Sequence, residues 1–306
     1  LSRDFLDTNG VKQHINVVVE TPAKETCYLD HIPGKVAALA PDLEKAWLEN
    51  LKDLNVCSQK GLAERFDSSI GGNSVLMPFG GKNQLTPTEG MVAKLPVLGA
   101  ETTTATAMTY GYNPYLMEWS PFHGAMYAVT ESVVRAVALG ADPAKLRLTL
   151  QEYFTKLHDA NGWGQPFSAL LGAFTTLDAL DLPAIGGKDS MSGSFEQLDV
   201  PPTLVSFATA IGKAGRVVST EFKKPESTVV LVRPILEPET GCPTFFSLKA
   251  NYKMVEQLIE EGMVAAACSV GYGGLAEALF KMGLGNRIGF KMMSDKTTAE
   301  MFAPMY

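Results

Sequence analysis

The chain has 306 residues, enough for one large domain or two ordinary ones. Apolar residues make up 46% and charged residues 19% of it, which predicts a well-packed core and excludes bulk disorder. The net charge of −7, with lysines and arginines scattered, argues against a nucleic-acid partner. The longest apolar runs are too short to span a bilayer, so we expect no membrane partner either.

Four cysteines lie far apart in the sequence, at Cys27, Cys57, Cys242 and Cys268. Without a CxxC pair they argue against a thiolate zinc site, and we expect reduced structural thiols. No signal peptide is visible, which favours a cytoplasmic protein. The chain begins at Leu1 without an initiator methionine, so we expect an internal piece of a longer protein.

The first hundred residues predict a strand, a linker, a helix and then short strands. A β-branched run predicts a strand over 14–20, and the proline-rich stretch 21–40 predicts a linker. Residues 41–54 predict a helix, because proline opens the segment and large apolar residues recur on one face. Glycine and proline pairs predict strands and turns over 71–96, and a Thr/Ala-rich strand follows within 95–108.

The middle of the chain predicts two long helices and two strands. Glycine and an Asn-Pro pair predict a loop over 111–114. Small and apolar residues at helical spacing predict helices over 121–139 and 167–180. Residues 204–211 and 228–232 predict strands.

The pattern changes near residue 234, where a proline-rich joint predicts a domain boundary. Beyond it we expect a helix over 248–261, a buried strand over 263–269 and a helix over 276–282. Strands and helices alternate without a regular βαβ rhythm, so the fold class predicted is α+β.

The run GGKDSMSG at Gly186–Gly193 places glycines beside a lysine, a carboxylate and two hydroxyls. Backbone amides such as that of Gly187, the charge of Lys188 and the hydroxyl of Ser190 suit a polyphosphate, and Asp189 suits a bridging metal. It is not a Walker A loop, because G-x-x-x-x-G-K-[ST] is absent. The alternative interpretation is a tight turn with solvated polar side chains.

A second charged motif, SQKGLAERFD, covers Ser58–Asp67 ahead of a glycine pair. Lys60, Arg65 and Asp67 are its charges, set among small residues. On spacing alone the better interpretation is an exposed connection from a helix to a strand.

Glu131 is a carboxylate within an otherwise apolar predicted helix. Such a group must be paired, bound to metal or at the helix edge. Arg135 is four residues further along, so an intrahelical ion pair is the alternative to a functional site.

The glycine-rich turn Gly271–Gly274 lies between a predicted buried strand and a predicted helix. Its glycines, Gly273 and Gly274 among them, let a ligand approach the backbone, and the helix start favours anions. Such turns are common, so the pattern by itself is a weak indication of phosphate binding.

Seven segments along the chain read SQKGLAERFD, MPFGGK, GYNP, SPFHGA, QEYF, GGKDSMSGSF and VPPTLVSFA. In this order they resemble the second synthetase half of the large phosphoribosylformylglycinamidine synthases, from about Ile15 to the end. That family belongs to the superfamily of aminoimidazole ribonucleotide synthetase.

The resemblance implies a domain organisation. Residues 1–40 would be the tail of a preceding domain plus a linker. Residues 41–233 would be an aminoimidazole ribonucleotide synthetase-like N-terminal-type domain, a sheet with packed helices. Residues 234–306 would be an incomplete C-terminal-type domain, a partial α/β sandwich.

The resemblance also implies a ligase of purine biosynthesis. In this family ATP activates the amide oxygen of formylglycinamide ribonucleotide, and ammonia from glutamine displaces the phosphoryl group to give formylglycinamidine ribonucleotide. The glutaminase domain and the first synthetase half lie outside this sequence. We therefore expect them to be its partners, with a small-molecule substrate, and the chain alone to be inactive.

In related long forms the second half holds an auxiliary nucleotide, so the resemblance implies ATP or ADP and Mg²⁺ as cofactors. Carried over to this sequence, Lys60 would meet the phosphate or base region of the nucleotide. Glu101 and Glu131 would be magnesium ligands.

Three departures from the family pattern affect this auxiliary site. Glu101 replaces a frequent aspartate, Arg135 replaces a frequent asparagine, and Ser269–Leu275 lacks both acids of D-x-S-D-G-G-L. These changes favour the hypothesis that a Glu131–Arg135 ion pair has replaced the metal.

Three functions therefore stay open. The first is a contributing part of the ligase, and the second is a non-catalytic, pseudo-symmetric scaffold half with a decayed nucleotide site. The third is another ATP enzyme of the superfamily, acting on selenophosphate or thiamine phosphate, which would need an Asp-rich N-terminal segment absent here. An unpaired sheet face also predicts that the chain pairs with itself as a homodimer.

Overall fold

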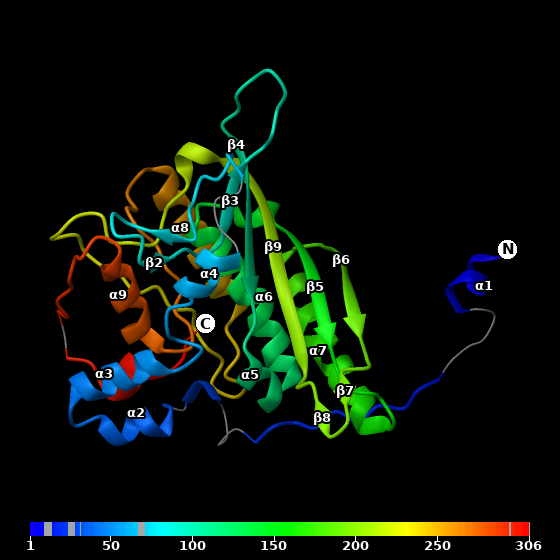
Figure 1. Cartoon of the computed structure of the whole chain (residues 1–306). Helices are drawn as coiled ribbons and strands as arrows, with labels where there is room; N and C mark the ends of the chain where they lie inside the picture. Colours follow the sequence, from blue (N-terminus) through cyan, green and yellow to red (C-terminus); the bar gives the residue numbers. More distant parts are fainter. Residues whose placement is uncertain (9–13, 24–27, 31, 67–70, 294, 306) are drawn as a thin grey trace.

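A computed structural model describes residues 1–8, 14–23, 28–30, 32–66, 71–293 and 295–305 of the chain. Of the residues named above, Cys27 and Asp67 lie outside these ranges. The described part is a mixed α/β fold built on a five-stranded sheet, with long helices against one face and shorter helices at one side (Figure 1).

The strand order in the sheet is β3-β4-β9-β5-β6. All neighbours are antiparallel except β5 and β6, which are parallel. The strands are β3 Met91–Lys94, β4 Thr104–Gly111, β9 Thr203–Lys213, β5 Arg147–Tyr153 and β6 Ala184–Ser190. β6 therefore forms one edge of the sheet.

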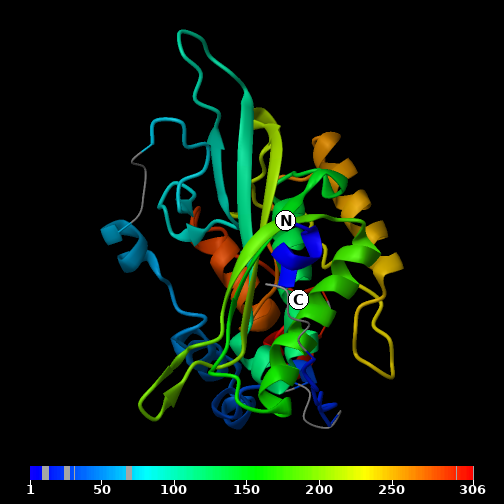
Figure 2. The same cartoon turned by 90° about the vertical axis from the view of Figure 1, so that its right-hand side faces the viewer.

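Helices α6 (Pro121–Ala138), α7 (Ala160–Leu180) and α8 (Phe245–Glu260) lie together on one side of the strands (Figure 2). They enclose a core that also takes alternate residues of β5 and β9, because successive side chains of a strand point to opposite faces. The largest fully buried members of this core are Met117, Val129, Val133, Leu146, Leu148, Phe154 and Leu204.

Local signals in the sequence set the starts of these helices. The side chain of Ser120 accepts a hydrogen bond from the backbone N–H of His123, with Pro121 in the first turn of α6. Asp159 caps α7 in the same way, accepting from the N–H of Gly162. Each cap satisfies one of the otherwise unpaired amides of a first turn.

Two glycines let other elements approach the backbone of α6. A Cβ atom on Gly111, at the end of β4, would lie 2.1 Å from the carbonyl oxygen of Ala128. One on Gly172, in α7, would lie 2.0 Å from the carbonyl oxygen of Phe122. Because real Cβ contacts are never that short, only glycine permits this packing of α6 between the sheet and α7.

A second, smaller core lies among helices at the side of the sheet. Its helices are α2 (Gly34–Leu39), α3 (Leu43–Lys52), α9 (Gly274–Leu284) and α10 (Thr298–Phe302). The core residues are Val36, Ala46, Phe222, Leu275, Ala276, Leu279, Met282, Met301 and Phe302. The first core includes residues of α8 and so crosses the predicted boundary at 233. The second core includes Val36, Ala46 and residues of α9, so it crosses the boundaries at both 40 and 233.

The remaining elements are short. They are α1 (Arg3–Thr8), α4 (Lys60–Phe66), α5 (Pro114–Trp119), the 3-10 turns Tyr28–Asp30, Pro143–Lys145 and Ala214–Arg216, and the strand pairs β1 (Phe79–Gly80) with β2 (Thr86–Pro87) and β7 (Ser194–Phe195) with β8 (Leu198–Asp199).

Most predicted helices are confirmed, with changed bounds. The helix expected over 121–139 is α6, that over 248–261 is α8 and that over 276–282 is α9. The helix expected over 41–54 is the shorter α3, capped by the side chain of Asp42. The helix expected over 167–180 begins earlier, because the cap at Asp159 outweighs the proline within α7.

Three predicted strands are wrong. Residues 14–20, 228–232 and 263–269 belong to no strand of the structure. Residues 14–20 run past the start of α7 instead, where the N–H of Val18 donates to the carbonyl of Ala160 at 2.9 Å. β-branched residues favour an extended backbone, but a strand also needs a paired neighbour.

The alternative interpretation of Gly186–Gly193 as a tight turn is wrong for its first part, because residues 186–190 belong to the edge strand β6. The Thr/Ala-rich strand expected within 95–108 is β4, which begins later, at Thr104. The loop expected over 111–114 ends at once in α5, because the side chain of Asn113 caps that helix at the N–H of Leu116. Strand β5 was not predicted.

The face of the sheet opposite α6, α7 and α8 carries exposed apolar side chains. Met108 and Tyr110 of β4 and Ile211 of β9 are exposed, and the β4–β9 register puts all three on this face. Among the described residues no helix is long and apolar enough to cross a membrane.

Replacing Gly172 with alanine should destabilise the fold. The new methyl group meets a backbone carbonyl of α6, so α6 and α7 must separate, at a cost of about 3 kcal/mol. Urea unfolding of the chain measures this as a lower midpoint. Gly61→Ala is the matched control: a Cβ there meets no atom within 4 Å, and alanine in a helix is neutral or slightly stabilising. Equal midpoints for the two variants would contradict the close α6–α7 contact.

Candidate functional site

The residues predicted to bind phosphate lie in three separate elements. Lys60 begins α4, Gly187–Ser190 belong to the edge strand β6, and Gly273 and Gly274 lie at the start of α9. In Figure 1, α9 and β6 lie at opposite sides of the sheet. The structure therefore does not gather these residues into one phosphate-binding loop.

Lys60 makes contacts within its own part of the chain. Its ammonium group pairs with Glu64 one turn further along α4. It also lies 5.9 Å from the centre of the Phe79 ring, within the range of a cation–π contact. The predicted nucleotide contact of Lys60 stays a prediction.

Strand β6 places the motif lysine beside the end of β5. Lys188 lies 5.8 Å from the centre of the Tyr153 ring. Asp189 pairs in register with Glu152 of β5, and Ser190 pairs with Tyr153. The carboxyl ends of these parallel strands thus gather a lysine, a hydroxyl and two carboxylates, where ligands of open α/β sheets commonly bind.

Glu152 is a residue of this strand end that the motifs did not indicate. Partial burial, and then the charge of Asp189, raise the pKa of Glu152 to about 7. The Glu152 carboxyl is therefore partly protonated near neutral pH. Glu152 lies in the QEYF segment, but its proximity to Asp189 follows only from the pairing of β5 with β6.

The start of α9 is already occupied by a carboxylate of the same helix. The backbone N–H of Gly273 donates to Glu277 at 2.7 Å, and Lys281 pairs with the other oxygen of Glu277. The amide of Asn50 donates to the carbonyl of Gly273 at 2.9 Å. An internal anion thus lies at the helix N-terminus, which favours negative charge.

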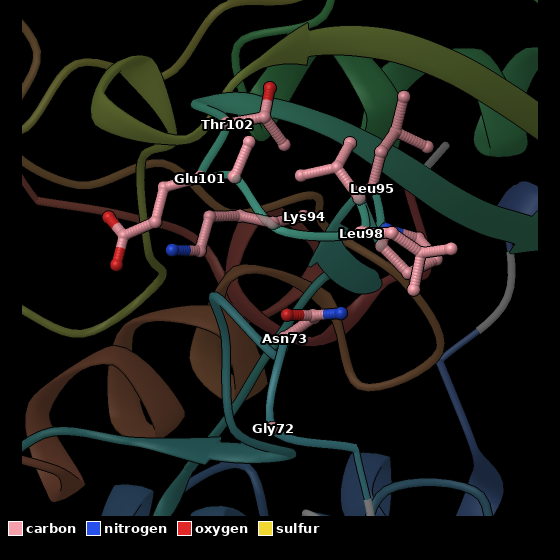
Figure 3. Close-up of a pocket in the computed structure, with 10 residues that line it drawn as sticks. Gly72, Asn73, Lys94, Leu95, Leu98, Glu101 and Thr102 are labelled. Carbon is pink, nitrogen blue, oxygen red and sulfur yellow. The ribbon is translucent and has the colours of Figure 1, made fainter.

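The two predicted magnesium ligands are far apart. Glu101 lies in the hairpin before β4, and its side chain extends to the same side as that of Lys94 (Figure 3). Glu131 lies beside Gly111, at the other end of β4. A strand of eight residues spans about 25 Å, so the two carboxylates do not share one ion in this structure.

Glu131 instead belongs to a buried cluster around Arg135, which we call the Arg135 cluster. One oxygen of Glu131 accepts from the guanidinium at 2.6 Å, and the other accepts from the N–H of Tyr112 at 2.9 Å. Glu89, in the turn before β3, has an oxygen 3.8 Å from the Nε atom of Arg135. Ser269 donates its hydroxyl to Glu89 at 2.6 Å.

Burial makes these charges interdependent. The side chains of Glu131 and Glu89 are 4% and 8% exposed, and that of Arg135 is 18% exposed. The guanidinium carbon also lies 4.5 Å from the centre of the Tyr110 ring. Burial raises the pKa of Glu131, although the positive charge of Arg135 acts in the opposite direction. Removing the arginine would leave two carboxylates with little solvent to stabilise them.

Magnesium does not fit the residues of the Arg135 cluster. The ion needs about six oxygen ligands at close to 2.1 Å in an octahedral arrangement. Both oxygens of Glu131 are engaged, and a guanidinium lies between Glu131 and Glu89. Within the described ranges, no group of three or more histidine, cysteine, aspartate or glutamate side chains is arranged to hold a metal.

Sequence patterns indicated only part of this cluster. The spacing of Glu131 and Arg135 predicted their ion pair, which the structure contains. No motif indicated Glu89, and Ser269 was named only as the first residue of the altered family turn. Their contact joins residues 180 positions apart, so no local spacing predicts it.

Two curated relatives match most of the chain. The phosphoribosylformylglycinamidine synthase subunit PurL of Methylocella silvestris is 26% identical over 274 residues, covering 83% of this chain and 35% of the relative. PurL of Nitrobacter winogradskyi is 27% identical over 275 residues, covering 82% and 35%. The chain thus spans about a third of the length of these relatives. No protein-family model matches it.

Solved structures of PurL have a similar fold. The structure of PurLQS from Thermotoga maritima superposes with a TM-score of 0.55 at 17% identity, covering 94% of this chain and 40% of that one. T. maritima PurL complexed with AMPPCP superposes with a TM-score of 0.53 at 15% identity, covering 87% and 38%. At these identities the likeness concerns the fold alone. Together with the sequence relatives, it confirms the resemblance to phosphoribosylformylglycinamidine synthases that the motifs predict.

Proposed function

We propose that the chain is part of a phosphoribosylformylglycinamidine synthase, a ligase of cytoplasmic purine biosynthesis with glutamine as amide donor. The main support is the sequence similarity to PurL across more than four-fifths of the chain. The seven family motifs, in the family order, support it as well. In this role ATP would activate the amide oxygen of formylglycinamide ribonucleotide, and ammonia would displace the phosphoryl group.

The contribution of this chain would be a phosphate contact at the end of β6. Lys188 lies on an exposed edge strand, so its ammonium group is available to an incoming phosphate. Ser190 adds a hydroxyl donor. Gly187 lets β6 lie close to β5, because a Cβ there would come 2.2 Å from the carbonyl oxygen of Leu150. Glu152 and Asp189 add two carboxyl groups at the same strand ends, and the raised pKa of Glu152, about 7, lessens its repulsion of an anion near neutral pH.

Replacing Lys188 with alanine should weaken binding of formylglycinamide ribonucleotide about tenfold. The variant loses one charge-assisted contact to the phosphate, and such contacts contribute about 1.5–3 kcal/mol. Isothermal titration of the chain with this nucleotide measures the dissociation constant.

Lys213→Ala is the matched control, since Lys213 lies at the far end of β9 and is equally exposed. It removes the same charge from the same sheet, and we expect its affinity to equal that of the unsubstituted chain. Equal losses in both variants, or no binding to the unsubstituted chain, would reject the contact at Lys188.

A second candidate is the scaffold half, which completes a larger enzyme without binding a nucleotide. The specific observation in its favour is that internal side chains fill both expected ligand positions. Arg135 provides the positive charge at Glu131, and Glu277 provides the negative charge at the amide of Gly273. A magnesium–nucleotide complex would have to displace both.

The chain should bind Mg-ADP no more tightly than it binds ADP in EDTA. Entry of the nucleotide would have to break the buried Glu131–Arg135 pair, which costs several kcal/mol. Calorimetric titration with Mg-ADP, and with ADP in EDTA, tests this directly. Tight binding that depends on magnesium would contradict the scaffold half and favour a working auxiliary site.

The partners proposed for the chain are the first synthetase half and the glutaminase domain of the same enzyme. The exposed side chains of Met108, Tyr110 and Ile211 support an association through the open face of the sheet. In the absence of those partners, we expect this face to pair two copies of the chain.

Light scattering should therefore give a dimer mass for the chain and a monomer mass for Ile211→Glu. The glutamate would place a charge on the apolar face, and burial of that charge opposes pairing. Phe246→Glu is the control, because Phe246 is at least as exposed but lies on α8, behind the sheet. A monomer mass for the unsubstituted chain at high concentration would contradict the self-pairing.

A further inference from the structure

The Arg135 cluster joins three segments that are remote in the sequence. Glu89 comes from the turn before β3, Glu131 and Arg135 come from α6, and Ser269 comes from the segment before α9. The first two segments belong to the sheet and its helices, and the third leads into the second core. The guanidinium therefore lies at the junction of the two cores.

Other contacts at the same junction depend on the position of this segment. The hydroxyl of Tyr272 donates to the carbonyl of Tyr112 at 3.1 Å, and Tyr112 in turn donates its N–H to Glu131. Asn50 of α3 holds the carbonyl of Gly273. A shift of Glu89 or Glu131 would thus move the segment from Ser269 to Gly273 against the sheet.

The two carboxylates require a cation at this place. Both are buried, and they are the only acidic side chains in ion contact with Arg135 among the described residues. A buried carboxylate without a counter-charge is destabilising, and two that face one position repel each other as well. Arg135 faces both from one side chain: its Nη2 donates to Glu131 at 2.6 Å, and its Nε lies 3.8 Å from Glu89, an ion contact without a hydrogen bond.

We propose that Arg135 is a built-in cation that holds the segment before α9 against the sheet in place of a metal ion. Its removal converts the Glu89–Glu131 pair into a site for a divalent cation. The position would then offer two carboxylates and the hydroxyl of Ser269, all oxygen ligands of the kind that Ca²⁺ and Mg²⁺ prefer. This inference rests on the scaffold-half candidate. It explains what stabilises the junction of the two cores when no metal or nucleotide is bound.

The test compares thermal unfolding of the full chain with and without divalent cations at one fixed pH, pH 8. The variants are Arg135→Ala and the double substitution Arg135→Ala with Glu89→Gln. Each is measured in EDTA, in CaCl₂, in MgCl₂ and in NaCl of equal ionic strength. Arg216→Ala is the matched control, because Arg216 pairs with Glu260 on the exposed surface.

We expect the unsubstituted chain and Arg216→Ala to have the same Tm in EDTA and in either divalent salt. Arg135→Ala should unfold roughly 5–10 °C lower in EDTA, as expected for a broken buried ion pair. CaCl₂ or MgCl₂ should restore at least half of that loss, and NaCl should not. The double variant should show no recovery, because one of the two carboxylate ligands is gone.

Two results would overturn the proposal. One is a Tm of the unsubstituted chain that depends on divalent cations beyond the NaCl control. The other is an Arg135→Ala variant that is indifferent to them. If Arg135→Ala does not fold in EDTA, refolding from urea in CaCl₂ and in NaCl decides: recovery only with calcium supports the proposal, and failure in both rejects it.

The outcome is separable from the test of the proposed function. Binding of Mg-ADP by the unsubstituted chain concerns the nucleotide site as a whole. The Tm of the Arg135 variants concerns only the cation at the junction. A chain that binds no Mg-ADP, with Arg135 variants that ignore divalent cations, would keep the scaffold half and remove the built-in cation.

Discussion

The guanidinium of Arg135, held between Glu131 and Glu89, is the interaction on which the arrangement of the two cores depends. A buried arginine loses its hydration, and only nearby carboxylates compensate that loss. Since the two carboxylates come from α6 and from the turn before β3, the ion contacts fix these elements relative to each other. The bond from Ser269 to Glu89 then extends the same constraint to the segment that leads into α9.

The glycines of the fold serve the same arrangement by letting backbones approach. Gly111 brings the end of β4 against α6 beside Glu131, so that the N–H of Tyr112 reaches the carboxylate. A side chain at Gly111 would push the strand away from the helix and leave that oxygen without its donor. Packing and electrostatics therefore impose one geometry here, and neither can change without the other.

How much of the molecule the sequence predicts depends on whether the signal is local. Helices α6 and α8 follow from apolar spacing, and the caps that set their neighbours lie within a few residues. Strand β6 was missed because a run of glycine and polar residues becomes a strand only by pairing with β5. Residues 228–232 show the converse, since β-branched side chains did not suffice without a paired neighbour. In the site, the spacing of Glu131 and Arg135 was readable, whereas Glu89 and Ser269 meet only through tertiary contacts.

Internal charges occupy the two positions at which a metal and a phosphate were expected. At Glu131 the fold provides a cation of its own, and at the amide of Gly273 it provides an anion of its own, the carboxylate of Glu277. Each internal group carries the charge that a metal or a phosphate would bring, so the surrounding residues keep a satisfied partner without either. Family-like residues can therefore be retained at both positions for the stability of the junction. The edge strand β6 has no such internal partner for Lys188 beyond the ring of Tyr153 in the described part of the chain, which makes it the better place to look for a bound phosphate.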